Sequence, residues 1–596
     1  MQLALSVLSM KYLLLALLFL LSVELAQAQA VLRASDAYEY LQGQRARVRA
    51  VVGTSEHPAA DSLQKGIRIL QEAMAYYQRP EIVVLAKTSK SLYYRKSDML
   101  FDMAILQGQL GQPEAAAASL QQLMTPEVAE VYASYILSEP ALAAARQSPP
   151  LKAALEKAMA LQQVFDSKAL ATPYQPNLSP AEKAAGLSKM WMEAKYNFAY
   201  FDHIPAVDWD QVYLRYLARV QATASTLAYF RVLQKFYAQL HDGHTGVWAI
   251  DGPLADSVYG RPPFSSQLVA GRVLVQSVRH DSLQRTGIVP GLEIIRIDGL
   301  PVVAYAERYV RPYQSGSTPQ NVDVQTYTYN LLRGSKSRPV RVEFRDARGR
   351  LFDRVLPRSG YGKLLPVVPV QLLFLPGNVA YLQVNEFETD AGFRRFAAAF
   401  DSIKATRALI IDLRRNGGGN SSNGSHILNY LTDKPYLLGR YASRTYSAVG
   451  RARGEGMRFE PVDTANYSAP AGGSNYYAQP VAVLIGAATF SAAVDFCAAY
   501  VGLKRGALVG EPTGGSTGQP LSFALPGGIM ARVCTKRDAY PDGTEWNGQG
   551  IRPTLLVQPT VAELAAGQDP VLAAALQLLH APAAAAKSAK PPRRSR

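Results

Sequence analysis

Residues 481–500 read VAVLIGAATFSAAVDFCAAY. It begins with an apolar run suited to a buried strand, passes through Ala488-Thr489-Phe490-Ser491, and continues into small residues that favour a helix. Three more apolar runs, NVAYLQVNEF, RALIIDLRRNGGG and GALVGEPTGG, are separated by segments long enough to hold helices. This alternation predicts an α/β arrangement with a largely buried sheet. Functional groups on such sheets lie on loops at strand ends, which makes Ser491 a candidate.

Ser491 lies where the predicted strand gives way to the predicted helix. Backbone amides are unpaired at a helix start, so they could hold an oxyanion that forms beside this serine. Its neighbours Ala492 and Ala493 are small enough to let a substrate backbone approach. The same position also suits a serine that only caps the helix. Taken alone, the stretch leaves a nucleophile and an N-cap both open.

Length and composition set wider limits. The 596 residues are 48% hydrophobic, which suits two to four folded domains and excludes a disordered protein. The net charge of +16 is scattered and lies partly in the tail KSAKPPRRSR, so we interpret it as surface charge and expect no nucleic-acid partner. Cys497 and Cys534 each have core-like neighbours, which favours two buried thiols over one bridge.

The first thirty residues carry a targeting pattern. Lys11 is followed by the apolar run YLLLALLFLLSVELA and then by Ala-Gln-Ala-Gln-Ala. A charged start, a short apolar run and small residues are typical of a cleaved signal peptide, because a membrane span needs about 20 apolar residues. We therefore expect an extracytoplasmic protein, periplasmic or secreted, with no transmembrane anchor after the signal is removed.

The periodicity of the apolar residues changes along the chain. Residues 31–175 show helical periodicity with a Gly-Gln-Pro corner, typical of an ordinary helical bundle or of one or two tetratricopeptide-like repeats. Helical patterns continue until the glycines of LHDGHTG, residues 240–246. Residues 259–360 then alternate as short strands and include GIVPGLEIIRIDGLPV at 287–302. This unit resembles a PDZ domain, whose sheet edge takes an extended peptide as an added strand; a β-rich insertion without a ligand is the alternative.

Five motifs occur in an order typical of one family: DGHTG ahead of the PDZ-like unit, then IDLRRNGGG, TFSAA, GEPTGG and GIRPT. Over residues 180–560 the chain resembles the S41 serine peptidases, the group of C-terminal processing peptidases and tricorn-like proteases. The resemblance implies a multidomain α/β protein with a crotonase-like ββα peptidase core. It also implies that Ser491 is the nucleophile and that the amides of Gly418 and Ala492 form the oxyanion hole. Gly417 and Gly419 are alternatives one register away and the expected substrate-binding residues.

A serine nucleophile needs a base, and the family divides at this point. Processing peptidases of the Ser–Lys type carry a lysine in the segment that here reads GEPTGGSTGQ, where Ser516 takes the equivalent position. No lysine occurs between Lys504 and Lys536. A Ser–Lys dyad at the usual place is therefore excluded.

The tricorn-like branch uses a histidine ahead of the PDZ-like unit, which implies His244 as the base. A neutral imidazole can accept the serine proton and return it to the leaving amine. Three alternatives stay open: His241, which suits a helix end; His426, after the glycine loop; and a purely structural His244 that caps its turn.

An imidazole base is usually oriented by a third polar group. In the tricorn-like pattern an acidic residue lies shortly before the last Gly-Ile-x-Pro motif, which implies Glu545. Asp542 is the alternative, although Asp542-Gly543 also suits an ordinary turn. The carboxylate could contact the histidine directly or through the hydroxyl of Thr245 or of another residue. The family has an acidic residue three places after the nucleophile, where this chain has Val494 followed by Asp495.

These residues predict an exported serine endopeptidase that cleaves protein or peptide substrates through an acyl-enzyme, with the substrate presented by the PDZ-like unit, possibly by its C-terminus. A catalytically silent peptide-binding or scaffolding protein is the main alternative, and hydrolysis of a non-peptide ester is a third. We expect no metal and no cofactor, because the seven histidines are dispersed and GEPTGGSTG lacks the lysine of a phosphate loop.

The predicted parts are a signal peptide (1–30), a helical domain (31–175), a helical segment carrying His244 (176–258), the PDZ-like domain (259–360), the peptidase core (361–562), and a C-terminal helix with a basic tail (563–596).

Overall fold

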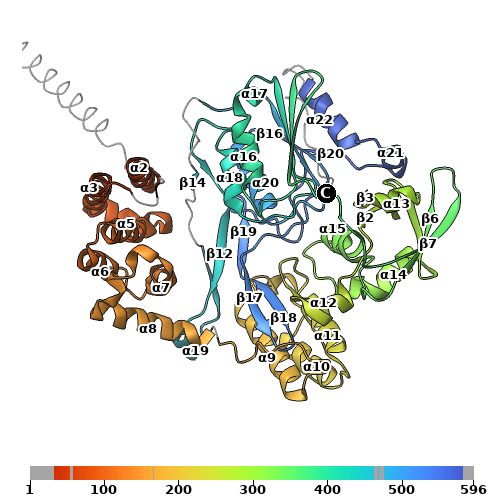
Figure 1. The fold of residues 1–596 in the computed structure, drawn as a ribbon, viewed down its shortest axis with the longest axis horizontal. Coiled ribbons are helices and arrows are strands. Elements are labelled where there is room, and N and C mark those ends of the chain that lie inside the picture. Colours follow the sequence, from red (N-terminus) through yellow and green to blue (C-terminus); the bar gives the residue numbers. More distant parts are fainter. Residues whose placement is uncertain are drawn as a thin grey trace, which may run out of the picture. The chain divides into compact units, whose positions relative to one another are not determined.

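The computed structural model describes residues 33–53, 55, 58–165, 167–461, 467–468 and 475–580 (Figure 1). The predicted signal peptide and the basic end of the tail lie outside the described residues. The chain forms two compact units: the first holds the described residues up to 165, and the second those from 167 onwards. Each unit is considered by itself. Within the described residues, no helix combines the length and apolarity that a membrane span requires.

The first unit is helical throughout its described residues. Buried side chains recur every three or four residues, as at Leu63, Leu70, Ala73 and Tyr77 of one helix, and together they form a single core. Consecutive helices pack against each other in pairs. The helices are α2 (Ala34–Val52), α3 (Ala60–Tyr77), α4 (Pro80–Ala86), α5 (Lys90–Gln109), α6 (Pro113–Gln121), α7 (Ala129–Ser138) and α8 (Pro149–Phe165), with the short turns η1 (Pro140–Leu142) and η2 (Ala145–Gln147).

The second unit begins with helices whose starts are set by capping side chains. Ser179 and Glu182 form a capping box, and Asp208 and Ser225 cap the two helices that follow. The elements are α9 (Pro180–Asn197), η3 (Phe201–His203), α10 (Trp209–Gln221) and α11 (Thr226–Ala238). Strand β1 (Gly246–Ala249) follows and pairs antiparallel with β18 (Ile529–Cys534), which also pairs with β17 (Pro520–Leu525). This pairing brings the LHDGHTG segment to the C-terminal part of the chain.

The β-rich segment contains a sheet in the order β2-β3-β4-β6-β7, with β5 paired to β4. Its edge strand β2 has the π-helical turn η5 beside it, where the Ser266 hydroxyl donates to the carbonyl of Tyr327 at 2.5 Å. The elements are α12 (Gly252–Val258), β2 (Phe264–Val269), β3 (Arg272–Val278), α13 (Asp281–Arg285), β4 (Glu293–Ile297), β5 (Leu300–Pro301), α14 (Val302–Tyr309), η4 (Arg311–Tyr313), α15 (Pro319–Asp323), η5 (Val324–Asn330), β6 (Val340–Arg345) and β7 (Leu351–Leu356).

The buried sheet of the second unit has the order β20-β16-β15-β10-β9-β8, and all its pairings are parallel except that of β8 with β9. One face packs against α16, α17, α18 and α20, and the other packs against α22 (Figure 1). The central strands β10 and β15 are buried along their whole length because helices cover both faces. The predicted multidomain α/β fold with a buried sheet is therefore confirmed.

The remaining bounds of this unit complete the description. They are β8 (Val370–Leu375), β9 (Val379–Val384), α16 (Ala391–Ala398), α17 (Phe400–Lys404), β10 (Ala408–Asp412), α18 (Ser421–Leu428), β11 (Tyr436–Leu437), β12 (Arg440–Thr445), α19 (Ala448–Ala452), β13 (Arg458–Pro461), β14 (Tyr467–Ser468), β15 (Val481–Ile485), α20 (Ala492–Leu503), β16 (Gly506–Gly510), β19 (Lys536–Ala539), β20 (Leu555–Leu556), α21 (Val561–Ala565) and α22 (Pro570–His580).

Candidate active site

Ser491 occupies a strained turn between β15 and α20. Its φ of 56° and ψ of −126° lie outside the regions that non-glycine residues favour. Such a conformation persists only where the surroundings determine it. The Ser491 amide donates to the carbonyl of Ser516 at 3.1 Å, and the Phe490 amide donates to the carbonyl of Asn416 at 3.0 Å. The Ser491 hydroxyl does not cap α20, so the alternative role as an N-cap has no hydrogen bond to support it.

His244 faces this serine across the fold. Its Nε2 lies 3.0 Å from Ser491 Oγ, although 247 residues separate the two in sequence. The imidazole stacks on the ring of Phe490, with centroids 4.7 Å apart and planes 13° from parallel. The His244 amide donates to Asp242 Oδ1 at 2.9 Å, which fixes the backbone of the loop. The structure thus brings the two main predicted site residues within hydrogen-bonding distance.

The second ring nitrogen of His244 has a partner that the sequence analysis did not assign. Nδ1 lies 2.8 Å from Ser516 Oγ, and both residues are buried. If Nε2 accepts the Ser491 proton, Nδ1 must carry the ring hydrogen and donate it to Ser516. Ser516 therefore contacts the imidazole through its hydroxyl and the Ser491 amide through its carbonyl.

Electrostatics keep this imidazole neutral. Burial is the largest cause, with Arg532 and Lys536 adding to it, and together they lower the pKa of His244 from 6.5 to about 3. Lys536 itself pairs with Asp538, with Nζ and Oδ1 2.7 Å apart. Burial raises the pKa of Asp538, and the nearby Lys536 opposes this effect. Near pH 7 His244 can therefore act as a proton acceptor.

Glu545 does not contact His244 in this structure. Its two carboxylate oxygens accept hydrogen bonds from Arg537 at 2.9 and 2.8 Å, and Arg537 also donates to Asp202 at 2.7 Å. The cause is a β-bridge between Ala539 and Glu545, which sets this carboxylate beside the guanidinium on β19. The group on Nδ1 in this structure is the Ser516 hydroxyl.

The side chains of the other candidates make contacts elsewhere, and among the described residues none of them forms a hydrogen bond with the side chain of Ser491 or His244. Asp542 accepts from the Thr544 amide at 2.9 Å in a turn. His241 is exposed and adopts a positive φ of 48° at the end of its helical segment. His426, on α18, lies against the ring of Phe393. Asp495 accepts from the Ser421 hydroxyl at 2.6 Å.

The glycine loop packs directly against the nucleophile turn. Gly418 has a φ of 106°, and a Cβ added to it would lie 2.5 Å from Ser491 Cβ, so only glycine fits. Its amide donates to Asn416 Oδ1 at 2.9 Å. The oxyanion role predicted for Gly418 therefore requires a donor that is already engaged. The amides of Ala492, Gly417 and Gly419 make no hydrogen bond to another described residue.

Two further expectations concern the cysteines and metal ions. Cys497 and Cys534 are both buried and unpaired, as the core-like neighbours suggested. Among the described residues, no group of three or more histidine, cysteine or acidic side chains is arranged to hold a metal ion.

Comparison with known proteins gives a family and a fold. The model of peptidase family S41 matches residues 378–557. The chloroplastic carboxyl-terminal-processing peptidase 2 of Arabidopsis thaliana is 25% identical over 306 residues, covering 49% of this chain and 51% of the relative. This chain therefore matches about half the length of that curated relative.

Solved structures of mature CPAF share the fold. The complex of mature CPAF with lactacystin has a TM-score of 0.54 at 16% identity, covering 67% of this chain and 99% of that one. A second structure of mature CPAF has a TM-score of 0.52 at 17% identity, covering 65% and 94%. At these identities the likeness concerns the fold alone.

Proposed function

Because residues 378–557 match the model of peptidase family S41, we propose that this chain is a serine endopeptidase that cleaves protein or peptide substrates through an acyl-enzyme. One observation carries the proposal: Ser491 Oγ lies 3.0 Å from Nε2 of His244, which is buried. A nucleophile within hydrogen-bonding distance of a base, with the base held by a third group, is the arrangement that activates a serine.

In the proposed mechanism, Ser491 Oγ attacks the substrate carbonyl while Nε2 of His244 takes the hydroxyl proton. The Nδ1–H group keeps donating its hydrogen bond to Ser516 Oγ, which holds the ring in the required tautomer. His244 then gives its proton to the leaving amine, which departs and leaves the acyl-enzyme. Water attacks this ester with the same imidazole as base, which releases the product and restores Ser491.

The oxyanion of the tetrahedral intermediate needs amide donors close to Ser491. We assign the Ala492 amide as one of them, since it follows the nucleophile and is not engaged by another described residue. For the second donor we favour Gly419 or Gly417, because the Gly418 amide is bonded to Asn416. The role of Gly418 is then to let the loop approach Ser491 closely.

Export and substrate presentation form the finer part of the proposal. The pattern of the first thirty residues supports an extracytoplasmic location. Strand β2 is the sheet edge on which a substrate peptide would add, but η5 lies beside it through the Ser266–Tyr327 hydrogen bond. Tyr327 of η5 belongs to the buried core of this segment, so η5 would lie against the strand that receives the peptide.

The test compares the purified wild-type chain with Ser491→Ala and His244→Ala on an unfolded protein and on fluorogenic peptides. We expect cleavage by the wild type only, and labelling by a fluorophosphonate probe that peptide mapping locates at Ser491. Equal cleavage by all three proteins would refute the mechanism. Absence of both cleavage and labelling in the wild type would favour the scaffolding alternative.

A further inference from the structure

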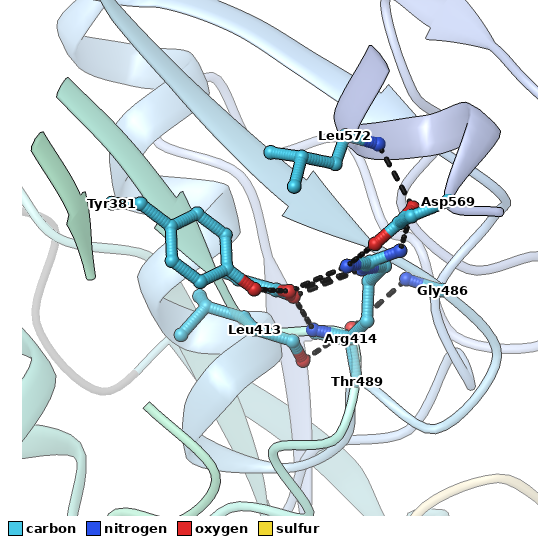
Figure 2. Close-up of polar contacts among 8 residues, drawn as sticks. Tyr381, Leu413, Arg414, Gly486, Thr489, Asp569 and Leu572 are labelled. Carbon is cyan, nitrogen blue, oxygen red and sulfur yellow. Dashed lines mark hydrogen bonds and ion pairs between the residues drawn. The ribbon is translucent and has the colours of Figure 1, made fainter. Parts of the chain in front are cut away.

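An ion-pair network lies behind the nucleophile turn, on the side that faces the C-terminal helix (Figure 2). Arg414 follows β10 and forms a bidentate ion pair with Asp569, with Nη1–Oδ1 at 2.8 Å and Nη2–Oδ2 at 2.7 Å. The same guanidinium binds Asp412 through Nε at 3.1 Å and Nη2 at 2.7 Å. The Tyr381 hydroxyl donates to Asp412 Oδ2 at 2.7 Å. Arg414 is therefore held in one orientation by two carboxylates.

The backbone beside Arg414 holds the turn that carries Ser491. The Leu413 carbonyl accepts from Thr489 Oγ1 at 2.9 Å, and Thr489 Oγ1 accepts from the Gly486 amide at 3.0 Å (Figure 2). Two residues beyond Arg414, the Asn416 carbonyl accepts from the Phe490 amide. Residues 413–416 thus form hydrogen bonds to both residues that precede Ser491.

Asp569 joins this network to the end of the chain. Its Oδ1 also accepts from the Leu572 amide at 3.0 Å, which caps the start of α22. That helix buries Val571 and Ala575 against the face of the sheet opposite α20. The position of residues 413–416 is therefore linked to the docking of α22.

We propose that Asp569 and Arg414 form a positioning pair that holds the glycine loop and the strained Ser491 turn in register, so that full activity depends on the C-terminal helix. The inference rests on the proposed peptidase function. A strained nucleophile is held only by its surroundings, and two hydrogen bonds from residues 413–416 hold Thr489 and Phe490, the two residues before it. A small displacement of this segment would misalign both the nucleophile and the oxyanion donors.

The test variant is Asp569→Asn, which keeps an acceptor for the Leu572 amide but removes the charge and one acceptor for Arg414. A misplacement of about 1 Å can cost on the order of 100-fold in rate. We expect kcat and the rate of fluorophosphonate labelling to fall together by roughly 10- to 100-fold, with KM within about twofold of wild type. Arg414→Lys, which keeps the charge but loses the bidentate geometry, should act in the same way.

A matched control comes from the other end of β10. Arg407 also ties α22 to the sheet, since its Nη1 donates to the Leu579 carbonyl at 3.1 Å, but it precedes the strand and contacts no part of the Ser491 turn. Arg407→Ala should lower the thermal midpoint, because it weakens the attachment of α22. It should leave kcat within about twofold of wild type, because Ser491 and His244 keep their positions and a loss of rate requires that the reacting groups be misplaced.

Three outcomes would decide the matter. Wild-type kcat and labelling in a folded Asp569→Asn or Arg414→Lys protein would overturn the inference and leave the peptidase function intact. An equal loss of kcat in Arg407→Ala would also overturn it, because general weakening of α22 docking would then suffice. If the wild type itself shows no Ser491-dependent cleavage or labelling, the proposed function fails, and the inference fails with it.

Discussion

Ser516→Ala tests whether the hydroxyl on Nδ1 orients the base. The substitution removes the only group that contacts this nitrogen among the described residues and leaves a buried ring N–H without an acceptor. An unsatisfied buried donor costs about 1–3 kcal/mol, which corresponds to roughly 5- to 150-fold in rate if the cost falls on the productive tautomer. We therefore expect kcat/KM to fall within that range.

The assay is steady-state cleavage of a fluorogenic peptide, with the labelling rate of Ser491 as a second readout. Ser516→Thr keeps the hydroxyl and should retain more activity than Ser516→Ala. Glu545→Gln serves as a comparison, since both Glu545 oxygens are bonded to Arg537. The Glu545→Gln variant should leave kcat/KM within about twofold of wild type, because the Glu545 carboxylate is bonded to Arg537 and not to the His244 imidazole. Full activity in Ser516→Ala together with a large loss in Glu545→Gln would refute the assignment and restore the carboxylate as the orienting group.

Three further predictions follow from burial and packing. In the unfolded chain His244 takes up a proton near pH 6.5, but in the native site only near pH 3, so the unfolded state binds more protons between these values. The thermal midpoint of the wild type should therefore fall relative to that of His244→Gln as the pH is lowered through this window; a constant difference would contradict the lowered pKa. Gly418→Ala should abolish labelling of Ser491, because the new Cβ would lie 2.5 Å from Ser491 Cβ, whereas Gly417→Ala, with no heavy atom within 4 Å of its added Cβ, should retain labelling. Cys497 and Cys534 should resist a thiol reagent in the native state and react at two thiols per chain after denaturation, because burial raises the pKa of each; rapid native labelling would show that the core opens.

The sequence allowed prediction of those parts of the fold that depend on local patterns of apolar and polar residues. Alternating apolar runs and helical segments indicated the α/β core because a buried parallel sheet requires them. The strand-to-helix position of Ser491 and the histidine of LHDGHTG were also readable, the latter only through the family resemblance. Their contact depends on β1 pairing with β18, a long-range register that no local pattern encodes.

The third group at the site could not be predicted for a similar reason. Glu545 looked suitable by type and position, but its carboxylate is taken by Arg537, a residue on β19 that a β-bridge brings beside it. Ser516 carries no signal of its own beyond replacing the family's lysine. The bond from the Gly418 amide to Asn416 likewise depends on one side-chain rotamer, which spacing in sequence does not determine.

The base is held from the β-rich segment as well as from the core. Ser315 Oγ accepts from the Asp242 amide at 3.0 Å and donates to the Asp242 carbonyl at 2.7 Å, and Ser317 Oγ accepts from the Gly243 amide at 3.1 Å. On the other side, Thr245 Oγ1 accepts from the Cys534 amide on β18 at 3.2 Å. Residues 315–317 directly precede α15 and η5, and η5 packs beside β2. Strand β2 and the position of His244 are therefore joined by one short stretch of chain.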